Sequence, residues 1–220
     1  MRNAMDKKIQ ASKRGYRSDL RAQQADSTRK AVLAAAGRVC RAGGWPNATI
    51  AAIAKDAGVS KETIYGVFGS KVALIGEMVK ANVAEHVPGQ HFLEQKRPRA
   101  ISAESDPIRQ IELWADYLTD ILKRVAPLMS VVRTGSQAEP EMSELYRALH
   151  QGRRANLAIL AQSIFSRGPL RNELSVKQVT NILWQSASPE MFSLLTEVDG
   201  YSNEEYAHWL AETLKALLLR

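Results

Sequence analysis

The chain is poor in several features that secreted, membrane-spanning and redox-active proteins use. Its 220 residues contain one cysteine, Cys40, so no disulfide can form within the chain, and a reducing, cytoplasmic location is expected. Cys40 lies on an apolar helix face, which favours a packed thiol over a redox sensor. No apolar run approaches the ~20 residues needed to cross a bilayer, and no hydrophobic signal segment opens the chain. We therefore expect no membrane partner.

Residues that carry out catalysis or bind metals are also scarce. The chain has four histidines, and two of them, His86 and His91, have no carboxylate or cysteine at ligand spacing. No nucleophile, metal or phosphate motif can be recognised, which argues against an enzyme. We expect no catalytic residues, no metal and no cofactor.

The charge that is present is unevenly distributed. Residues 1–85 contain 15 Lys and Arg against 7 Asp and Glu, whereas residues 86–220 contain 15 against 16. A basic head on a nearly neutral body is typical of a protein whose head alone meets nucleic acid. Residues 1–25 are basic and lack an apolar face, so they are expected to form a disordered arm. Such an arm can follow a phosphate backbone or enter a minor groove, or it can be no more than a solvated tail.

The most informative stretch of the sequence runs from Thr49 to Phe68. Thr49 and Ser60 are of a type that caps helices, and Gly58 between them can adopt the left-handed backbone of a tight turn. Apolar residues recur at helical spacing, first at Ile50, Ile53, Ala54 and Ala57 and then at Ile64, Val67 and Phe68. Two short helices joined by a tight turn containing glycine are the helix-turn-helix pattern. The alternative interpretation is a structural helical hairpin with a polar outer face.

The polar residues of this stretch indicate how it would meet DNA. The first turn of a recognition helix enters the major groove, where Lys61 can reach guanine or a phosphate and Thr63 can bind a base edge or a thymine methyl. Tyr65 and the helix N-terminus suit phosphate oxygens. The residues expected to bind DNA are Thr49, Ser60, Lys61, Glu62, Thr63, Tyr65 and Lys71.

The segment from Ser27 to Leu74 resembles the DNA-binding domain of the TetR family of bacterial transcriptional regulators. The positions that carry the resemblance are Thr28-Arg29, Ala34-Ala35-Ala36, Gly43-Gly44-Trp45, Thr49-Ile50, Ile53-Ala54, Ala57-Gly58-Val59-Ser60, Thr63-Ile64-Tyr65, Phe68, Ser70-Lys71 and Leu74. The resemblance implies an all-α fold, in which an N-terminal three-helix helix-turn-helix domain precedes a larger C-terminal helical regulatory and dimerisation domain. We assign residues 26–70 to the first domain and residues 71–220 to the second, with 71–85 as a linking helix.

Periodicity and capping residues predict that the rest of the chain is helical. Residues 86–105 are expected to be a connection. Helices are expected at about 26–42, 107–125, 128–134, 140–166, 176–198 and 203–219. Pro189 must kink or divide the helix that contains it, because proline removes a backbone hydrogen bond. Ser175 and Ser202 each precede a Gln or Glu by three residues, the capping-box pattern of a helix start.

The resemblance also implies a homodimer and a ligand pocket within the body. The pocket is expected to be lined by Trp114, Tyr117, Leu118, Ile121, Met129, Val132, Phe165 and Trp184. The dimer seam, formed by the last helices of each copy, is expected to contain Leu183, Met191, Leu194, Leu195, Trp209, Leu210, Leu214 and Leu217. For each of these residues the alternative is a place in the chain's own core. The expected partners are a small apolar or amphipathic effector and a palindromic double-stranded DNA operator, which would match a two-fold dimer.

These expectations describe a ligand-responsive transcriptional repressor. A ligand that prefers a state with mis-spaced heads would lower the affinity for DNA. One alternative is a transcriptional activator. Others are a helical enzyme or small-molecule-binding protein without sequence-specific DNA recognition, and a sequence-tolerant DNA binder of structural role.

Overall fold

The computed structural model describes residues 2–83, 95–166, 170–171 and 174–220 of the chain, and of residues 2–19 and 21 only the backbone. These residues form helices joined by short turns, and the only paired extended backbone among them is an isolated bridge between Leu170 and Leu219. The fold is therefore all-α, as predicted. None of the helices in this part of the chain combines the length and the apolar character that crossing a bilayer requires.

The bounds of the helices follow in chain order. They are α1 (Arg2–Asn47), α2 (Ile50–Ala57), α3 (Lys61–Phe68), α4 (Lys71–Val83), α5 (Lys96–Ala103), α6 (Pro107–Ser136), α7 (Pro140–Phe165), α8 (Val176–Ser186), α9 (Pro189–Ser193), the π-helical turn η3 (Leu194–Val198) and α10 (Asn203–Leu218).

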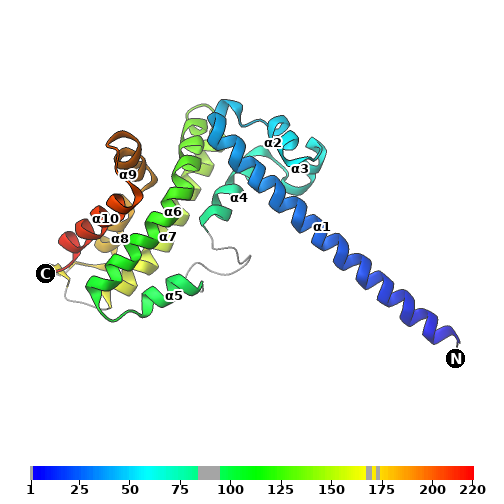
Figure 1. Cartoon of the computed structure of the whole chain (residues 1–220), viewed down its shortest axis with the longest axis horizontal. Coiled ribbons are helices and arrows are strands. Elements are labelled where there is room, and N and C mark those ends of the chain that lie inside the picture. The colour runs from blue at the N-terminus through cyan, green and yellow to red at the C-terminus, as the bar shows by residue number, and fades with distance from the viewer. Residues whose placement is uncertain (1, 84–94, 167–169, 172–173) are drawn as a thin grey trace.

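The second half of α1 packs with α2, α3 and the start of α4 to form a small head (Figure 1). Its core contains Val32, Ile53 and Ile64, none of which has any exposed surface. Gly44 interrupts α1 with φ 62°, close to the predicted end of this helix at about residue 42, and turns the chain toward α2. Cys40 is buried in the same core, and burial raises the pKa of its thiol to about 11, so the predicted packed thiol is confirmed.

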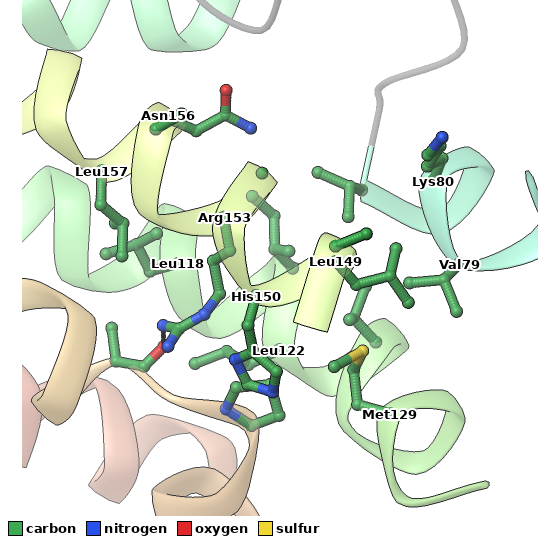
Figure 2. Close-up of a pocket in the computed structure, with 18 of the residues that line it drawn as sticks. Val79, Lys80, Leu118, Leu122, Met129, Leu149, His150, Arg153, Asn156 and Leu157 are labelled. Atoms are coloured by element: carbon green, nitrogen blue, oxygen red, sulfur yellow. Dashed lines mark hydrogen bonds between the residues drawn. The ribbon is translucent and has the colours of Figure 1, made fainter. Parts of the chain in front are cut away.

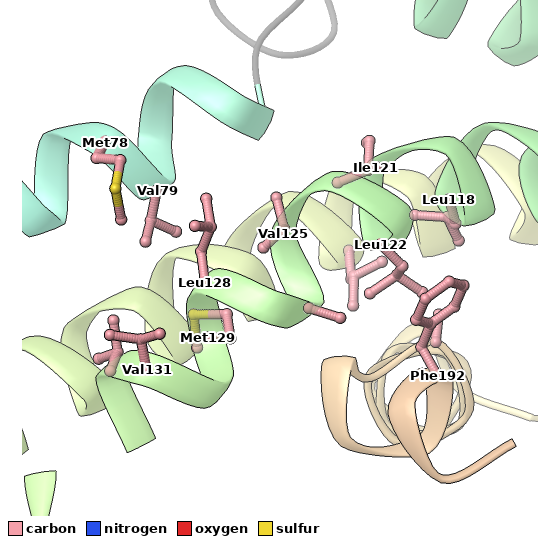
Figure 3. Packing of buried hydrophobic residues seen from close by; sticks show 14 of the residues in the cluster. Met78, Val79, Leu118, Ile121, Leu122, Val125, Leu128, Met129, Val131 and Phe192 are labelled. Atoms are coloured by element: carbon pink, nitrogen blue, oxygen red, sulfur yellow. The ribbon is translucent and has the colours of Figure 1, made fainter. Parts of the chain in front are cut away.

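The body is built around α6, which packs against α4, α7, α9 and α10 (Figure 1). Figure 3 shows Met78 and Val79 of α4 on one side of α6, and Phe192 of α9 beside Leu122 on another. These residues belong to a single apolar cluster that extends from α1 to α10. The core is therefore continuous from the head, through the linking helix α4, to the end of the chain.

The first helix is longer than the sequence predicts. A helix was expected to begin near Asp26 after a disordered arm, whereas the backbone is helical from Arg2 and this half of α1 extends away from the rest of the molecule (Figure 1). Residues 2–25 contain no proline and are rich in Ala, Lys, Gln and Arg, which are good helix formers. Helix propensity here outweighs the lack of an apolar face.

Two predictions about the body are wrong. Residues 96–103, assigned to a connection, form α5, in which Pro98 and Ile101 are buried and the Ile101 carbonyl accepts a hydrogen bond from Gln110 Nε2 (3.1 Å). The break expected before residue 128 does not occur, because α6 continues through Pro127. Packing of the residues on both sides of the proline against the core outweighs the one backbone hydrogen bond that it removes.

The later helices follow the prediction more closely. Pro189 divides the segment after α8, and Ser188 caps α9 by accepting a hydrogen bond from the Met191 N–H (3.0 Å). Both predicted capping boxes, at Ser175 and Ser202, are confirmed. The π-helical turn η3 was not predicted.

Candidate nucleic-acid interface and ligand cavity

Capping side chains and one glycine fix the two short helices of the head. Thr49 Oγ1 accepts a hydrogen bond from the Ala52 N–H (3.1 Å), and Ser60 Oγ accepts one from the Thr63 N–H (3.1 Å). Between the helices, Gly58 has φ 67° and ψ 33°, the left-handed conformation that a side chain disfavours. The caps and the turn predicted from the sequence are confirmed, and together they make a helix-turn-helix.

The outer face of α3 is open to solvent. Lys61 and Glu62 are exposed, Thr63 is half-buried and Tyr65 is 50% exposed. On the opposite side of the same helix, Ile64 is fully buried in the head. The helix therefore has one face committed to the core and one face free to meet a partner.

The start of α3 brings several kinds of polar group into one helical turn. The pKa of the Glu62 carboxyl is lowered, first by a hydrogen bond from its own backbone N–H and then by the Ser60 hydroxyl. Ser60 Oγ also lies 3.1 Å from Thr63 Oγ1. With the ammonium of Lys61, this turn offers a cation, a carboxylate and hydroxyls. Such a set can match the donors and acceptors that base edges display in the major groove.

Lys71 has a different environment from the one expected of a phosphate contact. Its Nζ lies 3.4 Å from the centre of the Trp45 ring, and desolvation by burial lowers its pKa. Trp45 packs in turn on Gly135 of α6. The contact is so close that a Cβ placed on Gly135 would lie 2.9 Å from Trp45 Cδ2. The contacts of Lys71 therefore favour a role in holding the head against the body, which its position in the sequence does not indicate.

The linking helix α4 makes close contacts with both parts of the molecule. In its middle, Glu77 forms an ion pair with Arg29 of α1. A Cβ on Gly76 would lie 2.9 Å from Leu145 Cδ1, so α4 approaches α7 closely at this point. The last turn of α4, including Val83, lines a cavity in the body. A shift of α4 would therefore change both the position of the head and the shape of the cavity.

An apolar cavity of about 440 Å³ lies between α4, α6 and α7 (Figure 2). Helix α6 contributes Leu118, Ile121, Leu122, Val125 and Met129, and α7 contributes eight residues between Ala148 and Leu157. The volume lies within the range of small-molecule sites, roughly 300–1,000 Å³.

One end of the cavity is polar. Arg153 donates from Nη2 to the Trp184 carbonyl (2.8 Å) and from Nη1 to the Ala187 carbonyl (3.1 Å), and its Nε has no hydrogen-bond partner in the part of the chain that the structure describes. Burial lowers the pKa of Arg153 to about 10, so the guanidinium stays charged at neutral pH. One turn earlier, His150 Nε2 lies 3.4 Å from Glu190 Oε1.

The nearest carboxylate, that of Glu190, is already engaged. Glu190 Oε1 accepts a hydrogen bond from the Tyr146 hydroxyl (2.9 Å). The neighbouring His150 imidazole, the Glu190 backbone N–H and Tyr146 lower the pKa of Glu190 to about 2, against the effect of burial. Burial and the Glu190 carboxylate raise the pKa of Tyr146 to about 12. At neutral pH this corner thus contains a carboxylate anion and a neutral phenol.

Comparison with known proteins agrees with the geometry of the head. Residues 32–78 match the family described as bacterial regulatory proteins, tetR family. Over 196 residues the chain is 26% identical to YdeS, an uncharacterised HTH-type transcriptional regulator of Bacillus subtilis, and the match covers 89% of this chain and 88% of YdeS. Residues 32–78 of this chain therefore belong to the TetR family. This is a family of transcriptional regulators, not of enzymes.

Solved structures of TetR-like regulators share the fold. NalD, the secondary repressor of the MexAB-OprM multidrug efflux pump in Pseudomonas aeruginosa, has a TM-score of 0.67 at 19% identity, over 90% of this chain and 98% of NalD. FadR from Bacillus subtilis, solved in complex with stearoyl-CoA, has a TM-score of 0.66 at 17% identity, over 84% of this chain and 96% of FadR. At these identities the likeness establishes the fold of the chain alone.

The cavity contains only part of the pocket predicted from the sequence. Leu118, Ile121 and Met129 line it. The other predicted residues lie elsewhere: Trp114, Tyr117 and Val132 are buried in the core, Trp184 lies beyond the polar end, and Phe165 is 42% exposed at the end of α7. Helix α6 is buried on most of its circumference, and apolar periodicity does not distinguish a side that faces packed neighbours from a side that faces a void.

Three residues predicted for the dimer seam belong to the chain's own core. Leu183, Leu210 and Leu214 have no exposed surface, because α10 packs on α6 and α8, so they cannot contact a second copy. The other five are Leu194 and Leu217, which are 52% and 45% exposed, and Met191, Leu195 and Trp209, which are partly buried.

The polar end of the cavity was not predicted from the sequence. Arg153 lies midway between Leu149 and Leu157 at i, i+4 spacing, so a cation interrupts an apolar stripe, and this signal was present in the sequence. In the described part of the chain, no three His, Cys, Asp or Glu side chains are grouped closely enough to hold a metal ion. His86 and His91 lie outside the described residues.

Proposed function

We propose that this TetR-family regulator is a homodimeric repressor that a small apolar or amphipathic molecule releases from a palindromic DNA operator. The observation that carries the proposal is the position of α4, which begins at Lys71, directly after the recognition helix, and ends at Val83 against the cavity. A ligand in the cavity contacts α4, so its affinity can differ between two positions of the head. If the ligand prefers a state in which the two heads are wrongly spaced for the operator, binding of the ligand lowers the affinity for DNA. Thermodynamic linkage then requires DNA to lower the affinity for the ligand by the same factor.

Base recognition is assigned to the first turn of α3. Lys61, Glu62 and Thr63 are the side chains that would reach base edges, and the exposure of this turn supports that role. Tyr65 and Thr49 would contact phosphates, where Thr49 can donate its hydroxyl proton while its oxygen caps α2.

Dimerisation is assigned to the last elements of the chain. Leu194 and Val198 of η3 are 52% and 78% exposed, and Leu217 of α10 is 45% exposed. A second copy packed on these side chains would remove apolar surface from water. It would also present two recognition helices to half-sites one helical turn of DNA, about 34 Å, or a multiple of this apart.

Selection from a random pool of DNA duplexes tests this function and yields the operator sequence in the same experiment. The purified chain should enrich a palindromic sequence, and sedimentation should give the mass of a dimer at the same concentration. Enrichment of no sequence would contradict a specific regulator. Enrichment of a single asymmetric half-site by a monomer would contradict the dimer.

A further inference from the structure

Resting on the function proposed above, we propose that the effector is an amphipathic acid, whose apolar body fills the cavity and whose carboxylate pairs with Arg153 and His150.

The hydrogen-bonding capacity of the Arg153 guanidinium is only partly used. The group lines the cavity, and two of its nitrogens donate to backbone carbonyls, but no carboxylate hydrogen-bonds to it among the described residues. Its Nε is buried and has no hydrogen-bond partner there. Removing a cation from water is costly unless an anion and hydrogen bonds compensate it. A ligand carboxylate at this end of the cavity would supply both.

The groups around Arg153 also favour an anionic ligand head over a cationic one. Figure 2 shows Arg153 and His150 extending from the same helix, and both rest against the Trp184 ring, at 5.1 Å from the guanidinium carbon and 6.0 Å between ring centres. His150 Nδ1 is buried and lacks a hydrogen-bond partner in the described part of the chain. The neighbouring carboxylate, Glu190, already accepts from Tyr146. An added carboxylate could therefore pair with the Arg153 guanidinium, to which Glu190 makes no hydrogen bond among the described residues, whereas a cationic head would be repelled by it.

The size and the mainly apolar wall of the rest of the cavity suit a hydrocarbon chain. Away from Arg153, most of the cavity wall is aliphatic, with side chains such as Leu122, Val125 and Leu149, while Gln95, Asn156 and the exposed Lys80 also line it. A volume of about 440 Å³ holds roughly 15 groups of the size of a water molecule, at ~30 Å³ each. An unbranched acid of about eight to twelve carbons matches both the volume and the polar end at Arg153.

The experiment compares three probes that share one tail and differ in the head. Decanoate, 1-decanol and decylamine are titrated into the unaltered full-length chain, and binding is followed by tryptophan fluorescence, since Trp184 contacts both polar residues. Decanoate should bind at least tenfold more tightly than 1-decanol, the difference that one charge-assisted hydrogen bond supplies. Decylamine should bind most weakly. This comparison needs no variant and so does not depend on whether a variant folds.

Matched variants then locate the carboxylate. Arg153→Gln should reduce the preference for decanoate over 1-decanol to less than threefold. Arg154→Gln, on the same helix but outside the cavity lining, should keep the preference. Equal or tighter binding of 1-decanol, no binding of any probe, or a preference that survives Arg153→Gln with the fold intact would each overturn the inference.

Failure of this inference can be told apart from failure of the proposed function. If the chain enriches a palindromic duplex but prefers 1-decanol, the regulator stands and the ligand class is wrong. If no duplex is enriched while decanoate binds through Arg153, the ligand class stands and the proposed function fails.

Discussion

Replacing Gly135 with alanine tests whether Trp45 fixes the head on the body. The new Cβ would lie 2.9 Å from Trp45 Cδ2 and 3.0 Å from Met142 Cε, closer than carbon atoms pack. The Trp45 ring cannot move away freely, because the Lys71 ammonium also lies against it. Overpacking of this kind costs about 1–3 kcal/mol, and the better helix propensity of alanine offsets up to about 1 kcal/mol. We expect a net loss of about 1–2 kcal/mol, which lowers the Tm of a chain of this size by about 3–6 °C.

The same substitution at Gly152 is the control. Gly152 is exposed within α7, and a Cβ there would meet nothing within 4 Å. Gly152→Ala should therefore stabilise the chain by up to about 1 kcal/mol and raise the Tm by about 2–3 °C. Both variants are compared with the unaltered chain by differential scanning calorimetry in one buffer. If the Tm of the Gly135→Ala chain equals or exceeds that of the unaltered chain, the contact between Trp45 and α6 accommodates the added methyl group and the reasoning is refuted.

Two further predictions concern the DNA interface on α3 and the loss of folding stability at acidic pH. Lys61→Ala should reduce discrimination at one base pair of a selected duplex by about 1–3 kcal/mol, measured by competition binding against single-base variants of the duplex. Lys123 is an exposed charge on α6, and Lys123→Ala should leave this discrimination unchanged. An equal loss of affinity for every sequence in the Lys61→Ala chain would contradict base reading. Because the pKa of Glu190 is lowered from its usual 4.5 to about 2, its carboxylate stabilises the fold above pH 4.5 and this stabilisation is lost as the pH falls toward 2. Its side chain is 36% exposed, so the contribution is about 1 kcal/mol. Urea unfolding should show Glu190→Gln to be less stable by that amount at pH 7 and equal to the unaltered chain near pH 2, and a constant difference would speak against this assignment.

The head could be predicted almost completely from the sequence, because its determinants are local. Caps, a positive-φ glycine and apolar spacing lie within twenty residues, and each acts on its immediate neighbours, as Thr49, Gly58 and Ser60 show. The exposure of Lys61 and Tyr65 followed from the same periodicity.

The cavity and the junction could not be predicted in this way, since they depend on contacts between distant segments. Trp45 meets Gly135 across ninety positions of the chain, and nothing local in either segment requires it. Helix α5 was missed because its stability comes from burial of Ile101 and a hydrogen bond from Gln110, not from propensity. The three leucines predicted at the dimer seam were apolar and correctly placed on helices, but tertiary packing, which the sequence pattern does not encode, put them inside.

The central claim is that the outer face of α3 meets the DNA groove. A photoreactive benzoylphenylalanine at Tyr65 on α3 tests it most directly, with the same residue at Ile108, which is 49% exposed on the body, as the control. On irradiation with a selected duplex, the chain labelled at position 65 should cross-link to the DNA within the palindrome, and the chain labelled at position 108 should not. Cross-linking from position 108 with none from position 65 would show that another surface binds DNA.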